Sequence, residues 1–185
     1  MKQMAFIAAL FLPLAAAAAE FSAVMPEKSS VAFVFKQMGV PMDGKFAKFT
    51  ARIGFDPAQA AKASAQIDVD VSSIDAGSGE ANDEVKGKNW FNAREFPVAR
   101  FVSSSVKALG GNRFEVLGKM SMKGRTRDVV APFSFRQDGP LAVLEGSIPI
   151  QREQYGIGEG AWSDTSIVAD EVQVRFRFTL GAAKK

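Results

Sequence analysis

The chain has 185 residues, a formal net charge of +3 at pH 7, and neither cysteine nor histidine. Without histidine it cannot form Ser-His-Asp or Cys-His nucleophilic sites, histidine-ligated haem or nearly all zinc sites. Without cysteine it forms no disulfide, so an apolar core must hold the fold together. Its basic residues are spread singly along the chain, whereas a nucleic-acid surface needs a clustered basic patch.

The first nineteen residues have the pattern of an export signal. Lys2 precedes a short apolar run at Met4–Leu14, and Ala17 and Ala19 have the small-residue spacing of a cleavage site. The run is shorter than the roughly 20 apolar residues that span a membrane. We therefore expect a signal peptide at residues 1–19, a mature protein of residues 20–185 and a periplasmic location. An uncleaved anchor or an ordinary N-terminal helix is the alternative.

Apolar and polar residues alternate through the N-terminal half, which predicts strands with one apolar face. Asp56 followed by Pro57 predicts the start of a short helix that ends before Ser64. Asp68 and Asp70 could suggest a metal or acid–base pair, but we interpret them as neighbours on the polar face of a strand. The expected strands are Phe21–Met25, Ser30–Lys36, Lys45–Phe55 and Ala65–Val71.

Residues 72–92 leave the strand pattern for about 20 residues, and long irregular segments of this kind are often functional. They contain a predicted short helix at Glu80–Lys86, followed by the apolar pair Trp90 and Phe91. We expect this insertion to cover one end of the sheet structure.

Alternation resumes in the C-terminal half and is most regular in the last strand, where Phe176 and Phe178 oppose Arg175 and Arg177. Pro132 falls on the outward parity of its strand, so that strand needs an edge or a bulge there. A glycine-rich connection precedes the last strand. The expected strands are Asn92–Val106, Arg113–Met122, Asp128–Arg136, Leu141–Ile150 and Glu171–Leu180.

Long amphipathic strands and tight hairpins predict an all-β single domain, residues 20–185. A closed antiparallel barrel of about eight strands, with two short helices near its ends, is slightly favoured over a sandwich because it leaves no exposed edges. The inward positions mix phenylalanine with alanine and glycine, which fits either a filled barrel or one that holds a ligand. No inward charge interrupts the best-defined strands, so a cavity would hold an apolar molecule.

Several short motifs, taken together and in this order, resemble the YceI-like family of exported, lipocalin-like proteins. They cover nearly the whole mature chain. The matching stretches are Ser30–Phe33 with Met38–Val40, Gly44–Phe46 through Phe55–Pro57, Ile67–Val69 through Ser73–Asp75, Trp90–Asn92 with Phe96–Pro97 and Phe101–Ser103, Met122–Val129, and Ile150–Arg152 with Tyr155–Gly158.

The resemblance implies a lipocalin-like barrel whose apolar tunnel holds an isoprenoid chain, such as that of a quinone or a polyprenyl lipid. It brings no fixed catalytic constellation, metal or covalent cofactor. Many relatives carry histidine where this chain has Gln37, and relatives with a segment like Gly158–Asp164 are often encoded near b-type membrane cytochromes. By analogy, this association suggests quinone handling.

We therefore expect a periplasmic lipid carrier that is not an enzyme. The expected lining residues are Phe33, Phe35, Phe49, Phe101, Phe114, Met120, Phe133, Phe176 and Phe178, with Trp90 and Phe91 as a lid. Arg152 and Tyr155 either meet a polar head group or, as we favour, anchor the glycine-rich loop. The rival hypotheses are an enzyme that acts on a lipid head group and a filled barrel that contacts a membrane cytochrome; a homodimer also stays open.

Overall fold

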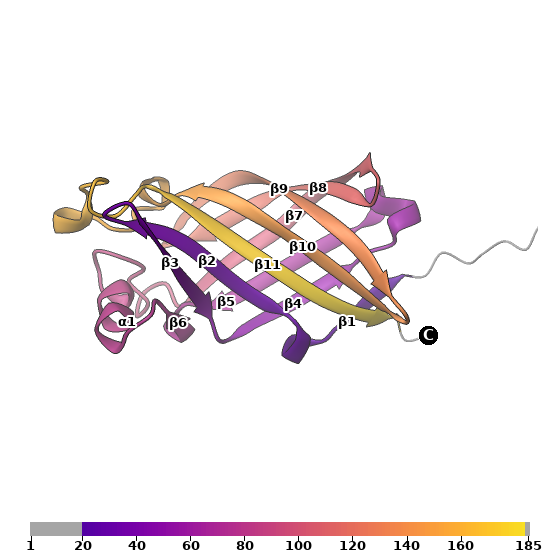
Figure 1. Ribbon diagram of the computed structural model, residues 1–185, viewed down its shortest axis with the longest axis horizontal. Coiled ribbons are helices and arrows are strands. Elements are labelled where there is room, and N and C mark those ends of the chain that lie inside the picture. Colours follow the sequence, from indigo (N-terminus) through magenta and orange to yellow (C-terminus); the bar gives the residue numbers. More distant parts are fainter. Residues whose placement is uncertain (1–19, 184–185) are drawn as a thin grey trace, which may run out of the picture.

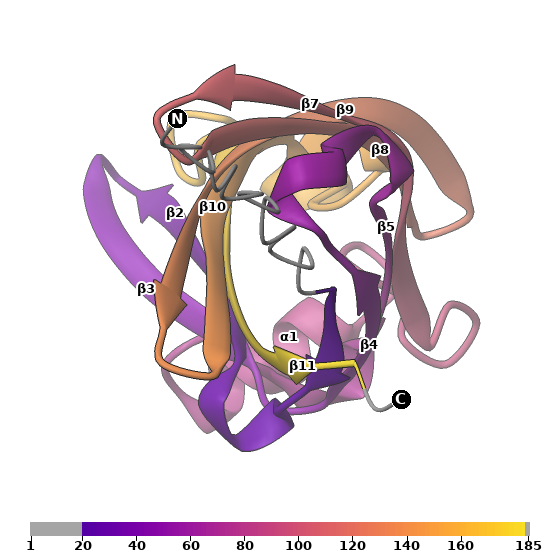
Figure 2. The same ribbon diagram turned by 90° about the vertical axis from the view of Figure 1, so that its right-hand side faces the viewer.

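The computed structural model describes residues 20–183, so the predicted signal peptide lies outside the described residues. Within this range, eleven strands form one antiparallel sheet that curls around a central space (Figures 1 and 2). Its order is β4-β5-β7-β8-β9-β10-β11-β2-β3-β6, with β1 beside β11. The strands are β1 Phe21–Val24, β2 Ser30–Gln37, β3 Val40–Phe46, β4 Phe49–Gly54, β5 Ser64–Asp70, β6 Ile74–Asp75, β7 Val98–Gly110, β8 Arg113–Met122, β9 Arg125–Asp138, β10 Leu141–Gln151 and β11 Glu171–Ala182.

The helices are short and lie outside the sheet (Figure 1). The helix α1, Gly79–Lys86, forms in the irregular insertion as expected, and the Ser78 hydroxyl caps it by accepting from the Ala81 amide at 3.2 Å. The second predicted helix is a 3-10 helix, Pro57–Lys62, capped by the Asp56 carboxylate. Further 3-10 turns occupy Pro26–Lys28, Val71–Ser73, Arg152–Tyr155 and Gly160–Trp162.

The all-β antiparallel prediction is confirmed, but a closed barrel of about eight strands is not. The sheet order runs between two ends, β4 and β6. The strand expected at 45–55 is interrupted at residues 47–48, which separates β3 from β4. The predicted strand Ala65–Val71 corresponds to β5, and the turn Val71–Ser73 separates it from β6, a short strand in the segment that was expected to be irregular. Phe46 before the first break and Ile53 after it both line the interior, as do Val69 and Ile74 on either side of the second, so the inward parity changes at each break. The single alternation expected across residues 45–55 therefore misses the break at residues 47–48.

Pro132 lies where the pairing of β9 with β10 ends. The strand β9 pairs with β8 on both sides of Pro132, but its ladder with β10 ends at Phe133 opposite Gly146. Proline has no amide hydrogen to donate, so β9 can leave β10 at this residue without losing a hydrogen bond. A Cβ on Gly146 would lie 2.3 Å from the Pro132 carbonyl oxygen, so this close approach requires glycine.

A cluster of aromatic rings fills the end of the sheet that carries β1, opposite α1 in Figure 1. Phe55 lies edge-on to Phe114 at a centroid distance of 5.0 Å, and Phe114 stacks on Phe133 at 5.4 Å. Phe21 and Phe135 complete the cluster. Such pairs add about 0.5–1.5 kcal/mol each beyond the burial of their area. This end of the interior is therefore packed core.

Candidate functional site

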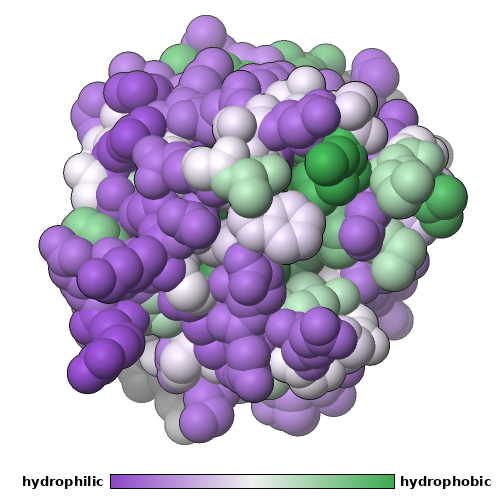
Figure 3. All heavy atoms as spheres, turned by 90° about the vertical axis from the view of Figure 1, so that its left-hand side faces the viewer, coloured by the Kyte–Doolittle hydropathy of each residue, from purple (hydrophilic) through white to green (hydrophobic). Residues whose placement is uncertain are grey.

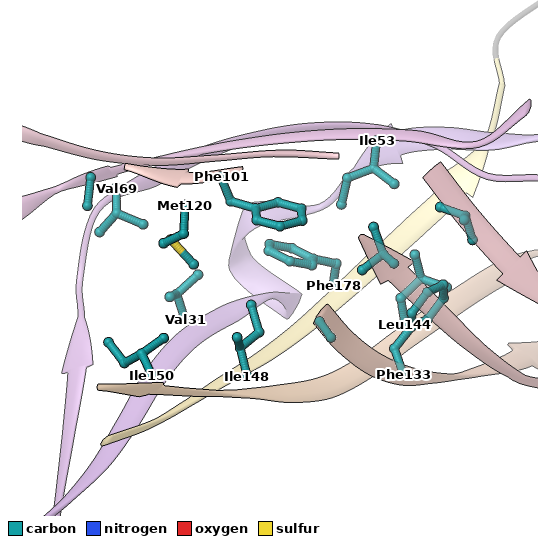
Figure 4. Packing of buried hydrophobic residues seen from close by; sticks show 14 of the residues in the cluster. Val31, Ile53, Val69, Phe101, Met120, Phe133, Leu144, Ile148, Ile150 and Phe178 are labelled. Carbon is teal, nitrogen blue, oxygen red and sulfur yellow. The ribbon is translucent and has the colours of Figure 1, made fainter. Parts of the chain in front are cut away.

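A central cavity of about 120 Å³ lies between the apolar faces of the strands. Figure 4 shows the side chains around it converging from opposite walls. Alanines on neighbouring strands leave space between the large rings, and one of them, Ala131, is fully buried. Five of the residues that the sequence singles out line this cavity: Phe101, Met120, Phe133, Phe176 and Phe178.

A second apolar cavity, of about 100 Å³, lies at the end covered by the irregular insertion. Val85 of α1 and Ile157 and Val168 of the loop between β10 and β11 help to close it. The sequence-predicted residues that line it are Phe33, Phe35, Trp90 and Phe91. The expected role of the insertion as a cover for one end therefore agrees with the structure.

The two cavities share part of their lining. Phe46, Met122 and Val174 border both of them. These three side chains come from β3, β8 and β11, so they meet from different walls. A chain-like molecule could therefore extend from one cavity into the other if these side chains moved.

Phe49 and Phe114 line neither of these two cavities. Phe49 lies edge-on to Phe178 at a centroid distance of 6.0 Å, so it packs against a ring that lines the central cavity. Phe114 belongs to the aromatic cluster at the β1 end. Inward parity places both residues correctly, but it cannot tell a cavity wall from packed core.

Arg152, only 2% exposed, is held entirely by backbone oxygens. Its Nε donates to the carbonyl of Ala169 at 3.2 Å, and Nη1 donates to those of Ile157 and Gly158 at 2.8 and 2.9 Å. Nη2 donates to the carbonyls of Trp162 and Val168, each at 2.8 Å. A guanidinium has five N–H donors, and all five are used here.

Arg152 therefore organises the loop between β10 and β11 and has no donor left for a ligand. A Cβ on Gly158 would lie 2.1 Å from its Nη1, so glycine is required at that point of the loop. Tyr155 is also buried, and burial raises the pKa of its phenol. Of the two roles considered for these residues, loop anchoring agrees with the structure.

Trp90 has a buried polar atom without a partner. Among the described residues, its Nε1 is the one buried side-chain nitrogen or oxygen that makes no hydrogen bond. The ring lies beneath the Arg152 guanidinium, 5.6 Å from its carbon, and beside Trp162 at a centroid distance of 5.5 Å. The sequence identifies Trp90 as a lid residue, but nothing in the sequence shows that its N–H would be left unpaired.

Charged groups lie on the outer wall and the loops. Arg100 donates two hydrogen bonds to the Asp68 carboxylate, at 2.5 and 3.1 Å, and these hold the pKa of Asp68 below its usual value. This agrees with the polar-face interpretation. In residues 20–183 no cluster of acidic, histidine or cysteine side chains could hold a metal ion, and no helix is long and apolar enough to cross a membrane.

The outer surface at the α1 end is mostly hydrophilic, with an apolar patch to one side (Figure 3). Exposed apolar side chains occur at the turn between β2 and β3 and in the loop beside it. Met38 is 77% exposed, and its amide donates to the Ile167 carbonyl at 2.7 Å. This contact joins the turn to the loop that Arg152 organises.

The model of the YceI-like domain matches residues 23–180. The chain belongs to the YceI-like family. A curated relative, a UPF0312 protein of Vibrio cholerae, is 27% identical over 90% of this chain and 94% of its own length. Another from Shewanella denitrificans is 29% identical over 66% of this chain and 65% of its own.

Several solved structures have the same fold. BcnA of Burkholderia cenocepacia is 47% identical, with a TM-score of 0.82 over 84% of this chain and 98% of its own. The YceI protein of Campylobacter jejuni is 15% identical, with a TM-score of 0.69 over 77% and 85%. A polyisoprenoid-binding domain of Saccharophagus degradans is 14% identical, with a TM-score of 0.65 over 89% and 99%.

Proposed function

We propose that this YceI-like protein is a periplasmic carrier of an isoprenoid lipid, a quinone or a polyprenyl chain, held inside the curled sheet. The observation that carries this proposal is the pair of apolar cavities that meet at Phe46, Met122 and Val174. The likeness to a domain described as polyisoprenoid-binding supports the same class of ligand.

Cavity size indicates how such a lipid would be accommodated. A dry cavity of roughly 150 Å³ holds one benzene molecule, so each cavity here has room for about one five-carbon isoprene unit. A longer chain requires the shared side chains to move and join the two spaces. Burial of about ten carbons would contribute roughly 8 kcal/mol, less the cost of ordering the chain.

We further infer that the sheet encloses the lipid as a lipocalin-like barrel wall. Phe21 and Phe55 exchange two backbone hydrogen bonds of 2.9 and 3.0 Å, which connect β1, the neighbour of β11, to the end of β4. At the strand breaks, the Ala47 amide donates to the Ser73 carbonyl at 3.1 Å, and the Asp70 amide donates to the Lys48 carbonyl at 3.0 Å. These bonds continue the wall across both interruptions.

No observation favours an enzyme that acts on a lipid head group. Such an enzyme needs a nucleophile or base with a shifted pKa facing the cavity. Among the described residues, those whose pKa is shifted lie on the outer wall or in loops, and buried Tyr155 lines neither cavity. Carriage of an intact lipid needs no such group.

The test is native mass spectrometry of protein exported by a bacterial host, before and after incubation with long-chain ubiquinone. We expect a bound lipid or uptake of the quinone. In the variant Ala131→Leu, the added carbons would occupy the central cavity and weaken uptake at least tenfold, while the melting temperature changes little. Neither bound lipid nor uptake in the native chain would refute the proposal.

The matched control is Ala142→Leu. Ala142 is fully buried but lines neither cavity, so the larger side chain has no space to enter. Overpacking of this kind costs about 1–3 kcal/mol of stability. We expect Ala142→Leu to lower the melting temperature, while the folded fraction still takes up quinone.

A further inference from the structure

The Trp90 indole has the one buried side-chain N–H that lacks a hydrogen-bond partner among residues 20–183. The side chain is 8% exposed and lines the cavity at the α1 end. Leaving a buried donor without an acceptor is unfavourable, because the group loses the hydrogen bond that it made to water. Trp162, which packs against it, has a partner for its own indole: its Nε1 donates to the Glu84 carboxylate at 2.7 Å.

Other residues pack against the rest of the Trp90 ring. The Cζ3 atom, on the six-membered ring, faces Gly158, and a Cβ placed there would lie 3.4 Å from it. The Arg152 guanidinium lies over the ring, and Trp162 packs beside it. The Nε1 edge lies across the indole from Cζ3, and it makes no hydrogen bond with any described residue.

We propose that Trp90 Nε1 is the head-group donor of the site and hydrogen-bonds to a neutral carbonyl oxygen of the bound lipid. This inference rests on the proposed function and specifies the chemistry of its ligand. An apolar chain would occupy the cavities, and its carbonyl oxygen would accept a hydrogen bond from Trp90 Nε1, the buried donor that has no partner in the described part of the chain. The positive Arg152 guanidinium, 5.6 Å from the ring, favours the partial negative charge of an oxygen there.

The same contacts disfavour an anionic head group such as a diphosphate. A buried anion needs paired charges and several donors. Arg152, the charged side chain that borders this cavity, already donates all five of its N–H groups to backbone carbonyls. One indole N–H suits one neutral acceptor, as in a quinone or a fatty amide.

The test compares three probes in detergent: a long-chain ubiquinone, the hydrocarbon squalene and a prenyl diphosphate. We expect the native chain to bind the quinone about tenfold more tightly than squalene, which is the effect of one hydrogen bond worth roughly 1.4 kcal/mol. The diphosphate should bind no better than squalene. Trp90→Phe should reduce the preference for quinone over squalene to near one.

The matched control is Trp162→Phe, which removes an indole N–H that binds Glu84 and does not line the cavity. This variant should keep the tenfold preference. In infrared spectra, the carbonyl stretching frequency of quinone should be lower when it is bound to the native chain or to Trp162→Phe than when it is free in detergent. Quinone bound to Trp90→Phe should show no such decrease. The ratio of the affinities for quinone and squalene corrects for any general loss of lipid affinity caused by the smaller phenylalanine ring.

Equal binding of quinone and squalene by the native chain would overturn the inference, as would tighter binding of the diphosphate. An unchanged preference in Trp90→Phe would also overturn it. In each of these cases the chain still binds lipid, so the proposed function stands. Failure of all three probes to bind the native chain would overturn both.

Discussion

Replacing Arg152 by methionine tests whether the loop between β10 and β11 depends on one buried cation. Methionine keeps much of the apolar stem but removes every donor. Five backbone carbonyls, contributed by residues 157–169, would lose their partner. The cation–π contact with Trp90 would be lost as well.

The size of the effect follows from these contacts. A hydrogen bond to a charged group contributes about 1.5–3 kcal/mol, so five bonds give a gross value of roughly 7–15 kcal/mol. The net loss is smaller, because the loop can open and let water reach its carbonyls, and because the buried cation no longer has to be desolvated. We expect a loss of about 3–5 kcal/mol, a large share of a typical stability of 5–15 kcal/mol.

Urea denaturation followed by circular dichroism measures the total loss, and hydrogen exchange locates it. Amides of residues 152–170 should exchange much faster in Arg152→Met, while those of β8 keep their protection. Arg152→Lys should be intermediate, because it keeps the charge but offers three donors. Arg175→Met is the matched control: Arg175 is exposed and lies 3.8 Å from Asp43, so its loss should cost under about 0.5 kcal/mol. A loss below about 1 kcal/mol in Arg152→Met would refute this reasoning.

Two smaller effects should follow from local contacts. Asp68→Asn should lower the free energy of unfolding by about 0.2–1 kcal/mol at pH 7, because it breaks the ion pair with Arg100. Since the folded pKa of Asp68 is lowered, this loss should shrink as the pH falls below the ordinary value of 3.8 and disappear below the folded pKa. A constant loss in urea titrations down to pH 2 would contradict the assignment. Gly44→Ala should lower the free energy of unfolding by about 1–3 kcal/mol, because the new Cβ would lie 2.2 Å from the Phe33 ring. Gly79→Ala is the control, because a Cβ there would have no neighbour within 4 Å. Equal shifts of the melting temperature in the two variants would contradict this prediction.

The sequence predicted the inward face of most strands, although it missed Phe46. In β7 it singled out Phe101 as a lining residue, and Phe101 is buried, while Val98 and Val102 are 46% and 41% exposed. This success has a local cause: the pleat fixes side-chain direction from one residue to the next. The helix in the insertion followed in the same way from short-range preferences.

The candidate site could be predicted only in part. Inward parity brought Phe101, Phe176 and Phe178 to the central cavity, but it also selected Phe114, which belongs to packed core. Whether an inward ring borders a space depends on the sizes of the residues that face it from other strands of the curled sheet. Those partners are distant in sequence, and a strand pattern does not identify them.

By itself, then, the sequence determined the class of fold, the faces of the strands and the apolar character of the interior, because each depends on residue spacing within one segment. Only the tertiary structure decided where the strands break and where space remains. It also decided that the Arg152 guanidinium donates its hydrogen bonds to backbone carbonyls and that Trp90 Nε1 donates none. The partners of Arg152 are backbone carbonyls, which every residue carries, so no side-chain pattern could mark them.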